Sequence, residues 1–93
     1  MNKIEKLEIR GIKRGDLIAY LIDLGGEYFS DCRDGKKVKI GNQDWQCDLS
    51  EEETYTFMHS EIPKVYLTFQ SENQPVLVEV IRKFRLKSFR AGG

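Results

Sequence analysis

The sequence predicts an α+β fold in which two helices pack on one face of a curved antiparallel sheet. Between Tyr28 and Gln70, apolar and polar residues alternate through short runs, a pattern typical of antiparallel strands with one buried and one solvated face. Before and after this stretch, apolar residues recur at three- and four-residue spacings, which indicates amphipathic helices. We therefore expect the order strand, helix, four strands, helix in a single domain spanning residues 1–93.

The first strand and helix are predicted from the alternation and spacing of residues 4–24. Residues 4–10 alternate charged and apolar side chains, which predicts a strand that could stand at a sheet edge. Gly11 to Gly15 interrupt this pattern, and the carboxylate of Asp16 suits the first turn of a helix. The apolar stripe of that helix consists of Leu17, Ile18, Tyr20, Leu21, Ile22 and Leu24. Gly25-Gly26 supplies the left-handed backbone that ends it.

The four central strands are predicted from the turns that separate them. Asp34-Gly35 is the strongest hairpin signal, because a type I′ turn requires positive φ at both central residues. Asn42-Gln43 predicts a second turn, and residues 50–53 and 60–63 predict polar loops. These turns place the following cross-strand pairs on the inner face: Val38 with Cys47, Ile40 with Trp45, Leu49 with Tyr55, and Phe57 with Leu67. All of these side chains are expected under the helices.

Residues 74–89 are predicted to form the second helix. Its apolar stripe consists of Leu77, Val80, Ile81, Phe84 and Ser88. Asn73 suits the N-cap, Pro75 suits the first turn, and basic residues gather toward the C-terminus as the helix dipole prefers. Valines at positions 76, 78 and 80 also alternate, so a strand is the alternative.

The charges cancel over the whole chain but are unevenly distributed along it. Fifteen basic and fifteen acidic residues give a near-neutral protein, which disfavours nucleic acid and anionic membranes as partners. Residues 44–72 carry seven acids against Lys64, whereas the segment from Asn73 onward carries five bases against Glu79. We expect two solvated faces that complement each other within the monomer. The alternative is a basic C-terminal segment, including Arg82 and Arg85, that docks an acidic partner.

The two cysteines and the absence of a long apolar run suggest a cytosolic protein. No segment approaches the roughly 20 apolar residues of a membrane span, and the N-terminus lacks the apolar run of a signal peptide. Cys32 and Cys47 have no metal-ligand spacing, and the predicted pairing points them to opposite faces. Two reduced thiols are therefore expected.

The uncovered face of the predicted sheet is the main candidate binding surface. It would be lined by Lys37, Lys39, Gln46, Asp48, Thr56, Met58, Tyr66 and Thr68. Lys37, Lys39, Gln46, Met58 and Tyr66 are the candidate contacts there for a protein or a small ligand. A tyrosine beside lysines could also hold single-stranded nucleic acid, but the neighbouring acids argue against it. No cofactor is expected.

Three further features are weak signals of chemistry. His59, the only histidine, is expected on the inner face near Trp45, and without a placed nucleophile it indicates no catalytic site. The carboxylates of residues 44–53 lack the regular spacing of a metal loop, so no metal site is predicted. The segment from Gly11 to Asp16 follows a strand and opens a helix, but it lacks the glycine spacing of a phosphate-binding loop.

The chain ends in Gly92-Gly93, as ubiquitin-like modifiers and sulfur carriers do. In those proteins a tail without side chains threads into the active site of an adenylating enzyme. Two departures weaken the comparison. Those carriers begin with a β-hairpin before their helix, whereas one strand leads directly into a helix here, and the tail here follows a predicted helix. A frayed end is the simpler expectation.

Three features together suggest a family resemblance: the strand entering Gly11-Ile12-Lys13-Arg14, the leucine-striped helix closing in Leu24-Gly25-Gly26, and the run of four strands. Their order resembles the TATA-binding-protein-like class of folds. Within it, the chain is similar to the C-terminal domain of proteins related to the small subunit of molybdopterin synthase. That domain is uncharacterised, so the resemblance implies a fold but no catalytic residue. The chain departs from those proteins in having no attached ubiquitin-like domain.

These observations rank three hypotheses for function. The first is a small cytosolic, non-enzymatic binding or accessory module that uses the open sheet face or the basic C-terminal segment. The second is a carrier activated at Gly92-Gly93, and the third is an enzyme that uses His59. An edge strand could also pair with another copy to form a homodimer.

Overall fold

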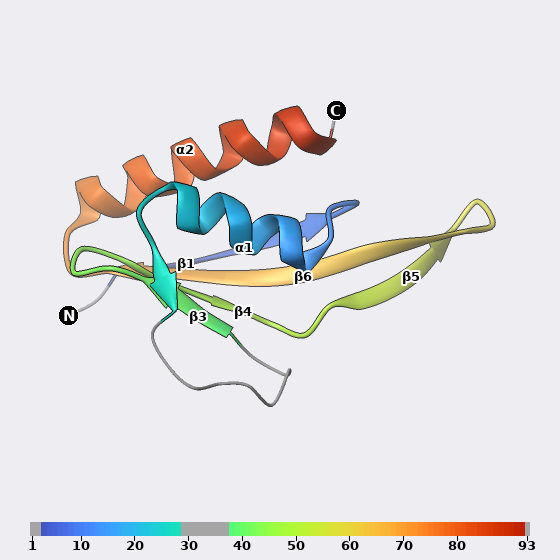
Figure 1. Ribbon diagram of the computed structural model, residues 1–93, viewed down its shortest axis with the longest axis horizontal. Helices are drawn as coiled ribbons and strands as arrows, with labels where there is room; N and C mark the ends of the chain where they lie inside the picture. Colours follow the sequence, from blue (N-terminus) through green and yellow to red (C-terminus); the bar gives the residue numbers. More distant parts are fainter. Residues whose placement is uncertain (1–2, 29–37, 93) are drawn as a thin grey trace.

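The structure is a computed structural model that describes residues 3–28 and 38–92 (Figure 1). The strands in these ranges are β1 Lys3–Arg10, β2 Glu27–Tyr28, β3 Val38–Gly41, β4 Gln46–Leu49, β5 Glu53–Phe57 and β6 Ser60–Ser71, and the helices are α1 Arg14–Asp23 and α2 Gln74–Gly92. All strands pair antiparallel in the order β1-β6-β4-β3-β2. Strand β5 pairs with residues 60–64 at the start of the long β6, whereas β4 pairs with residues 67–70 near its end.

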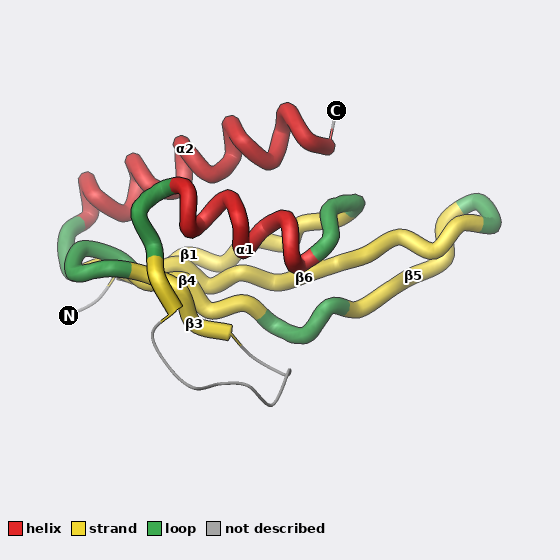
Figure 2. Tube along the Cα trace, viewed as in Figure 1, coloured by secondary structure: helices red, strands yellow, loops and turns green. Residues whose placement is uncertain are grey.

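Both helices lie on the same face of the sheet, so the molecule has two layers (Figure 2). This arrangement confirms the predicted α+β class with an open antiparallel sheet. Between the helices, the described ranges contain five strands, β2 to β6, where four were expected. The hairpin of β5 and β6 extends beyond the ends of both helices as a two-stranded arm (Figure 1).

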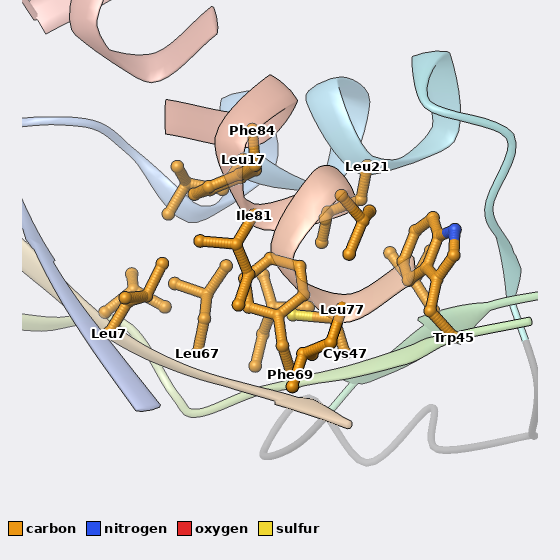
Figure 3. Close-up of a cluster of buried hydrophobic side chains, with 14 of the residues drawn as sticks. Leu7, Leu17, Leu21, Trp45, Cys47, Leu67, Phe69, Leu77, Ile81 and Phe84 are labelled. Atoms are coloured by element: carbon orange, nitrogen blue, oxygen red, sulfur yellow. The ribbon is translucent and has the colours of Figure 1, made fainter. Parts of the chain in front are cut away.

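The core lies between the two layers (Figure 3). Its members come from both helices and from strands β1, β3, β4 and β6, and those with no exposed surface include Leu17, Leu21, Ile40, Cys47, Val65, Leu67, Phe69 and Phe84. The rings of Phe69 and Phe84 meet edge to face at 5.4 Å, an arrangement that aromatic pairs favour. The predicted core positions of α2 and β6 are therefore confirmed, as are Leu17 and Leu21 of α1, whereas Ile22, which was predicted in the same stripe, is 43% exposed.

Helix α1 ends at the predicted pair of glycines. Gly25 has a φ of +101°, and its N–H donates to the carbonyl of Ile22 at 3.0 Å. The N–H of Gly26 reaches back to the carbonyl of Leu21 at 3.0 Å, which completes a Schellman-type stop. An added Cβ at Gly26 would lie 2.7 Å from the side chain of Ile40, so only glycine fits where the helix packs onto the sheet.

Helix α2 confirms the helical prediction for residues 74–89 and extends it to Gly92. The Oδ1 atom of Asn73 accepts a hydrogen bond from the N–H of Val76 at 3.4 Å, as an N-cap does. Apolar packing against the sheet overrides the β-branched alternation of its first turns, so the strand alternative is wrong. Neither helix in the described ranges has the length and apolar character needed to cross a membrane.

Strands β3 and β4 keep their predicted faces but pair in a different register. The observed pairs on the inner face are Val38 with Leu49 and Ile40 with Cys47. The turn is longer than predicted because the Oδ1 atom of Asn42 accepts hydrogen bonds from the N–H groups of Asp44 and Trp45, at 2.7 and 3.1 Å. A shift of two residues leaves every side chain on its own face, so the core prediction for these strands survives.

Strand β5 is where the predicted pairing is wrong. It pairs with β6, as predicted, but not with β4. The turn between β5 and β6 lies at Met58-His59 rather than at residues 60–63. Both turn residues have positive φ, 50° and 70°, which is the backbone of a type I′ turn. Phe57 therefore lies opposite Ser60 and not opposite Leu67.

This register reverses the face of β5. Tyr55 and Phe57 share a face with Tyr66, on the side of the sheet away from the helices, and not with Leu67 as predicted. Thr56, expected on the outer face, lies opposite Glu61 on the other side of the arm. The shift from the predicted register is an odd number of residues, so every side chain of the strand changes side.

Candidate functional site

The outer face of the sheet brings together only part of the predicted binding surface. Lys39 lies opposite Asp48, and Gln46 lies opposite Gln70, with all four side chains on the face without helices. The ammonium nitrogen of Lys39 is 4.0 Å from a carboxylate oxygen of Asp48, so this lysine is already paired within the chain. Lys37 and the predicted Asp34-Gly35 turn lie outside the described residues.

Met58 and Tyr66 lie on the arm and at its base rather than beside Lys39. Met58 occupies the turn at the tip of the arm and is 80% exposed. Tyr66 stands on β6 where the arm joins the main sheet, and 42% of its surface is exposed. Met58 therefore lies at the tip of the arm and Tyr66 at its base.

An apolar strip with two cations fills the space between them. It consists of Tyr55, Phe57, Ile62 and Tyr66, with Arg10 and Lys64 beside them, and we call this set the aromatic face. The guanidinium of Arg10 lies 5.3 Å from the ring centre of Tyr55, and the ammonium of Lys64 lies 5.4 Å from that of Tyr66. Phe57, at the outer end, is 59% exposed. Cations over ring faces attract the tyrosine rings, and Tyr66 keeps 42% of its surface exposed while Tyr55 is half-buried.

Nearby carboxylates neutralise the two cations of the aromatic face. Glu8 accepts a hydrogen bond from Arg10 at 3.2 Å and lies 4.0 Å from the ammonium of Lys64. The same carboxylate, through its hydrogen bond and its charge, raises the pKa of Arg10. Tyr66, and after it the carboxylates of Glu53 and Glu8, raise the pKa of Lys64. Both residues stay cationic at neutral pH, but their charge is balanced inside the chain.

Arg82 and Arg85 lie away from the outer face, on α2. Arg82 donates two hydrogen bonds to Glu79, of 3.1 and 2.6 Å, and this contact lowers the pKa of the Glu79 carboxyl. Both arginines border a groove of about 660 Å³ between the end of β1 and the last turns of α2. The structure therefore separates the two predicted binding regions onto different sides of the molecule.

The ion pairs of α2 do not join the basic C-terminal segment to the acidic residues 44–72, as the predicted charge complementarity would require. Within the described ranges, its ion pairs join Lys87 to Asp23 and Arg82 to Glu79. Neither carboxylate belongs to the acidic stretch of residues 44–72. One ion pair of the basic helix is therefore with α1, and the other lies within α2.

The residues considered for catalysis are not assembled into a site. His59 is an exposed turn residue and not an inner-face residue near Trp45, as was predicted, because the turn falls on it. Burial raises the pKa of the Cys47 thiol far above its ordinary range, and the neighbouring Asp48 adds to this, so the thiol stays protonated at neutral pH. Within residues 3–28 and 38–92, no three His, Cys, Asp or Glu side chains are grouped to hold a metal ion.

The start of α1 already carries an anion from the chain itself. The N–H of Arg14 donates to Oε1 of Glu52 at 2.7 Å, so a carboxylate sits at the positive end of the helix. This agrees with a plain strand-to-helix connection at Gly11 to Asp16. At the other terminus, Gly92 is the last residue of α2, and Gly93 lies outside the described residues.

Sequence reasoning missed five members of the aromatic face: Arg10, Tyr55, Phe57, Ile62 and Lys64. The usual sign of a two-residue hairpin turn is Asn, Asp or Gly at its centre, and Met58-His59 contains none of them. The signal that could have revealed the arm is the polarity of residues flanking the turn. Positions 54, 56, 61 and 63 are the polar or proline positions, whereas 55, 57 and 62 are apolar.

Residues 5–93 match the model of a family described as archaeal MoaD-like protein. Neither the curated proteins nor the solved structures gave a match.

Proposed function

We propose, from the premise that this chain belongs to the archaeal MoaD-like protein family, that it is a non-enzymatic accessory module that binds a protein partner through its aromatic face. The observation that carries the proposal is the reversed polarity of the arm. In the main sheet the apolar side chains face the helices, whereas in the β5–β6 arm they face away from them. No helix in the described chain lies over the arm (Figure 2), and on its apolar side Phe57 and Tyr66 are 59% and 42% exposed.

The composition of the aromatic face favours a protein surface over other ligands. Contiguous exposed apolar side chains on a soluble protein mark sites of association, and Tyr and Phe are enriched at the centres of such sites. Nucleic acid would need cations free to meet phosphates, but Arg10 and Lys64 are balanced by Glu8 and its neighbours. The broad, extended shape of the arm suits another protein better than a small molecule.

A binding experiment with a matched control tests this function. Partners captured by the intact chain would be identified and then titrated against purified variants. Phe57→Ser together with Tyr66→Ser should weaken binding by about 100-fold, since buried aromatic anchors each contribute on the order of 1–2 kcal/mol or more. Thr56→Ala is the control, because this side chain lies on the opposite side of the same strand.

Two results would contradict the proposal. If the double variant bound a captured partner as tightly as the native chain, the aromatic face would not be the docking surface. If Thr56→Ala weakened binding to the same extent, the loss would reflect distortion of the arm and not loss of the contacts.

The carrier function is the second candidate, supported by the Gly92-Gly93 ending and by the family. Its requirement is an extended tail, and α2 continues to Gly92 instead. The single strand that leads into α1 also differs from the hairpin start of the carriers.

If the chain is a carrier, incubation with ATP, a sulfur donor and the adenylating enzyme of the source cell should replace a carboxylate oxygen of Gly93 by sulfur. Mass spectrometry of the intact chain detects that exchange, and a chain lacking Gly92 and Gly93 is the control.

A further inference from the structure

Strand β1 is an edge of the sheet along its whole length. It pairs with β6 from Lys3 to Arg10, and no described strand pairs with its other side. The N–H of Gly11 bonds to the carbonyl of Pro63 at 2.9 Å, which fixes which residues point toward β6. Because antiparallel strands alternate their hydrogen bonds, the backbone groups of Ile4, Lys6, Glu8 and Arg10 point to the open side.

The side chains along this edge select one way of pairing with a second copy. Two identical antiparallel strands can be centred on different residues. Centring on Lys6 places lysine opposite lysine, and centring on Glu8 places glutamate opposite glutamate. Centring on Leu7 places Lys6 opposite Glu8 in both directions, on the outer face. Opposite charges directly across a strand pair are stabilising and like charges are not, so of these three registers only the one centred on Leu7 is complementary. Centring on Ile9 would place Glu8 opposite Arg10, but those two side chains already pair within the chain, and only the last three residues of β1 would overlap.

The helix side of the same edge is also complementary to a second copy in this register. Glu5 of the second copy would lie opposite Ile9, on the side that faces the helices. There Ile9 lines the groove of about 660 Å³, together with Arg82, Arg85, Leu86 and Phe89. The carboxylate of Glu5 would therefore reach a groove rimmed by two arginines.

Exposed apolar residues of α2 lie on the flank of the helix above β1. Val78, Arg82, Arg85 and Phe89 follow each other at helical spacing, and Phe89 is 79% exposed. Val78 and Leu86 are exposed too. In a symmetric pair, α2 of each copy runs antiparallel to the other on the same face of the joined sheet, which brings these apolar residues toward one another.

From these observations we propose that the chain forms a symmetric dimer in which two β1 strands pair antiparallel about Leu7 and join the two sheets. The charged residues at the edge, which often prevent strand pairing, act here to fix its register. The two-fold axis runs perpendicular to the sheet. Both aromatic faces therefore lie on the same side of the dimer, and Arg10 is the one member of each that belongs to the paired strand.

The test measures self-association by sedimentation over a range of concentrations. Lys6→Pro removes an N–H that points to the open side, which leaves the pairing with β6 intact but blocks pairing with a second copy. Lys6→Ala, which keeps that N–H, is the matched control. The native chain should dimerise, Lys6→Pro should remain a monomer, and Lys6→Ala should still dimerise with a weakened constant.

A charge exchange tests the register and does not depend on whether the proline variant folds. Lys6→Glu should weaken dimerisation by about tenfold, since each of two symmetric contacts becomes a like-charge pair. Glu8→Lys should weaken it similarly, and the double variant should recover it, because the opposite charges are restored in exchanged positions. A native chain that stays monomeric at every concentration, or a double variant that does not recover, would overturn the proposal. Phe57→Ser with Tyr66→Ser should leave the dimer unchanged, which separates this contact from the aromatic face.

Discussion

Cys47 is the residue whose chemistry is most altered by the fold. Its side chain is fully buried on β4 and faces α2 across the core (Figure 3). Burial disfavours the thiolate, which is the reactive form of the residue, so the sulfur acts as a small apolar group. The predicted reduced state of this thiol agrees with its place in the core, and Cys32 lies outside the described residues.

The burial of Cys47 predicts an alkaline loss of stability. In the folded state its pKa is raised well above the ordinary 9.0, so the unfolded chain releases this proton first as the pH rises. The contribution of the Cys47 thiol to the free energy of unfolding is fully present below pH 9. Above that pH it falls by about 1.4 kcal/mol per pH unit. In a Cys32→Ser background, denaturation at increasing pH should show a shallower decline for Cys47→Ala than for native Cys47. Parallel curves would contradict the assignment.

Among the elements, the two helices could be predicted and the strand pairing could not. Each helix has its own start and stop signals, such as Asn73 and Gly25-Gly26, and these act over a few residues. Strand pairing depends on turns, and two turn predictions that could be checked failed in different ways. Asn42 lengthened one turn by two residues, while Met58-His59 formed another without a turn sequence. A register shift of an even number of residues keeps each side chain on its predicted face, whereas an odd shift moves it to the other face. The side chains of β5 alone were therefore assigned to the wrong face.

The β5–β6 turn predicts a stabilising substitution. Positive φ at a residue with a side chain costs about 1 kcal/mol or more, and both Met58 and His59 have it. Met58→Asn with His59→Gly should therefore raise the free energy of unfolding by about 1–2 kcal/mol, as measured by denaturant titration. Met58→Ala, which keeps the unfavourable backbone, should give no such gain. An unchanged midpoint in the double variant would show that the turn is not of type I′.

At the scale of the whole molecule, the same kind of residue has opposite roles in the main sheet and in the arm. Phe69 is buried between the layers and touches Trp45 and Phe84, whose ring centres lie 6.4 and 5.4 Å away. Phe57 lies on the arm beyond the reach of the helices and is exposed. The first therefore holds the layers together, and the second is available to a partner.

Two alanine variants measure this difference directly. Phe69→Ala should lower the free energy of unfolding by about 3–5 kcal/mol, because it removes a buried ring and leaves a cavity. Phe57→Ala should change it by less than about 0.5 kcal/mol, because a ring that is 59% exposed contributes little packing. Thermal or denaturant unfolding of both variants gives the comparison. A large loss for Phe57→Ala would mean that β5 contributes to the core after all.

The sequence by itself determined the fold class, the two helices, the Asn73 cap, the Gly25-Gly26 stop and most core residues of β3, β4, β6 and the helices. These depend on local periodicity and on short-range capping, which are encoded by neighbouring residues. Only the tertiary structure decided which strands pair, and hence which aromatic residues face outward. Pairing joins segments far apart in the chain, and one turn of two residues decides the side on which a whole strand presents its side chains. The aromatic face and the open β1 edge, on which both proposals depend, follow from that long-range choice.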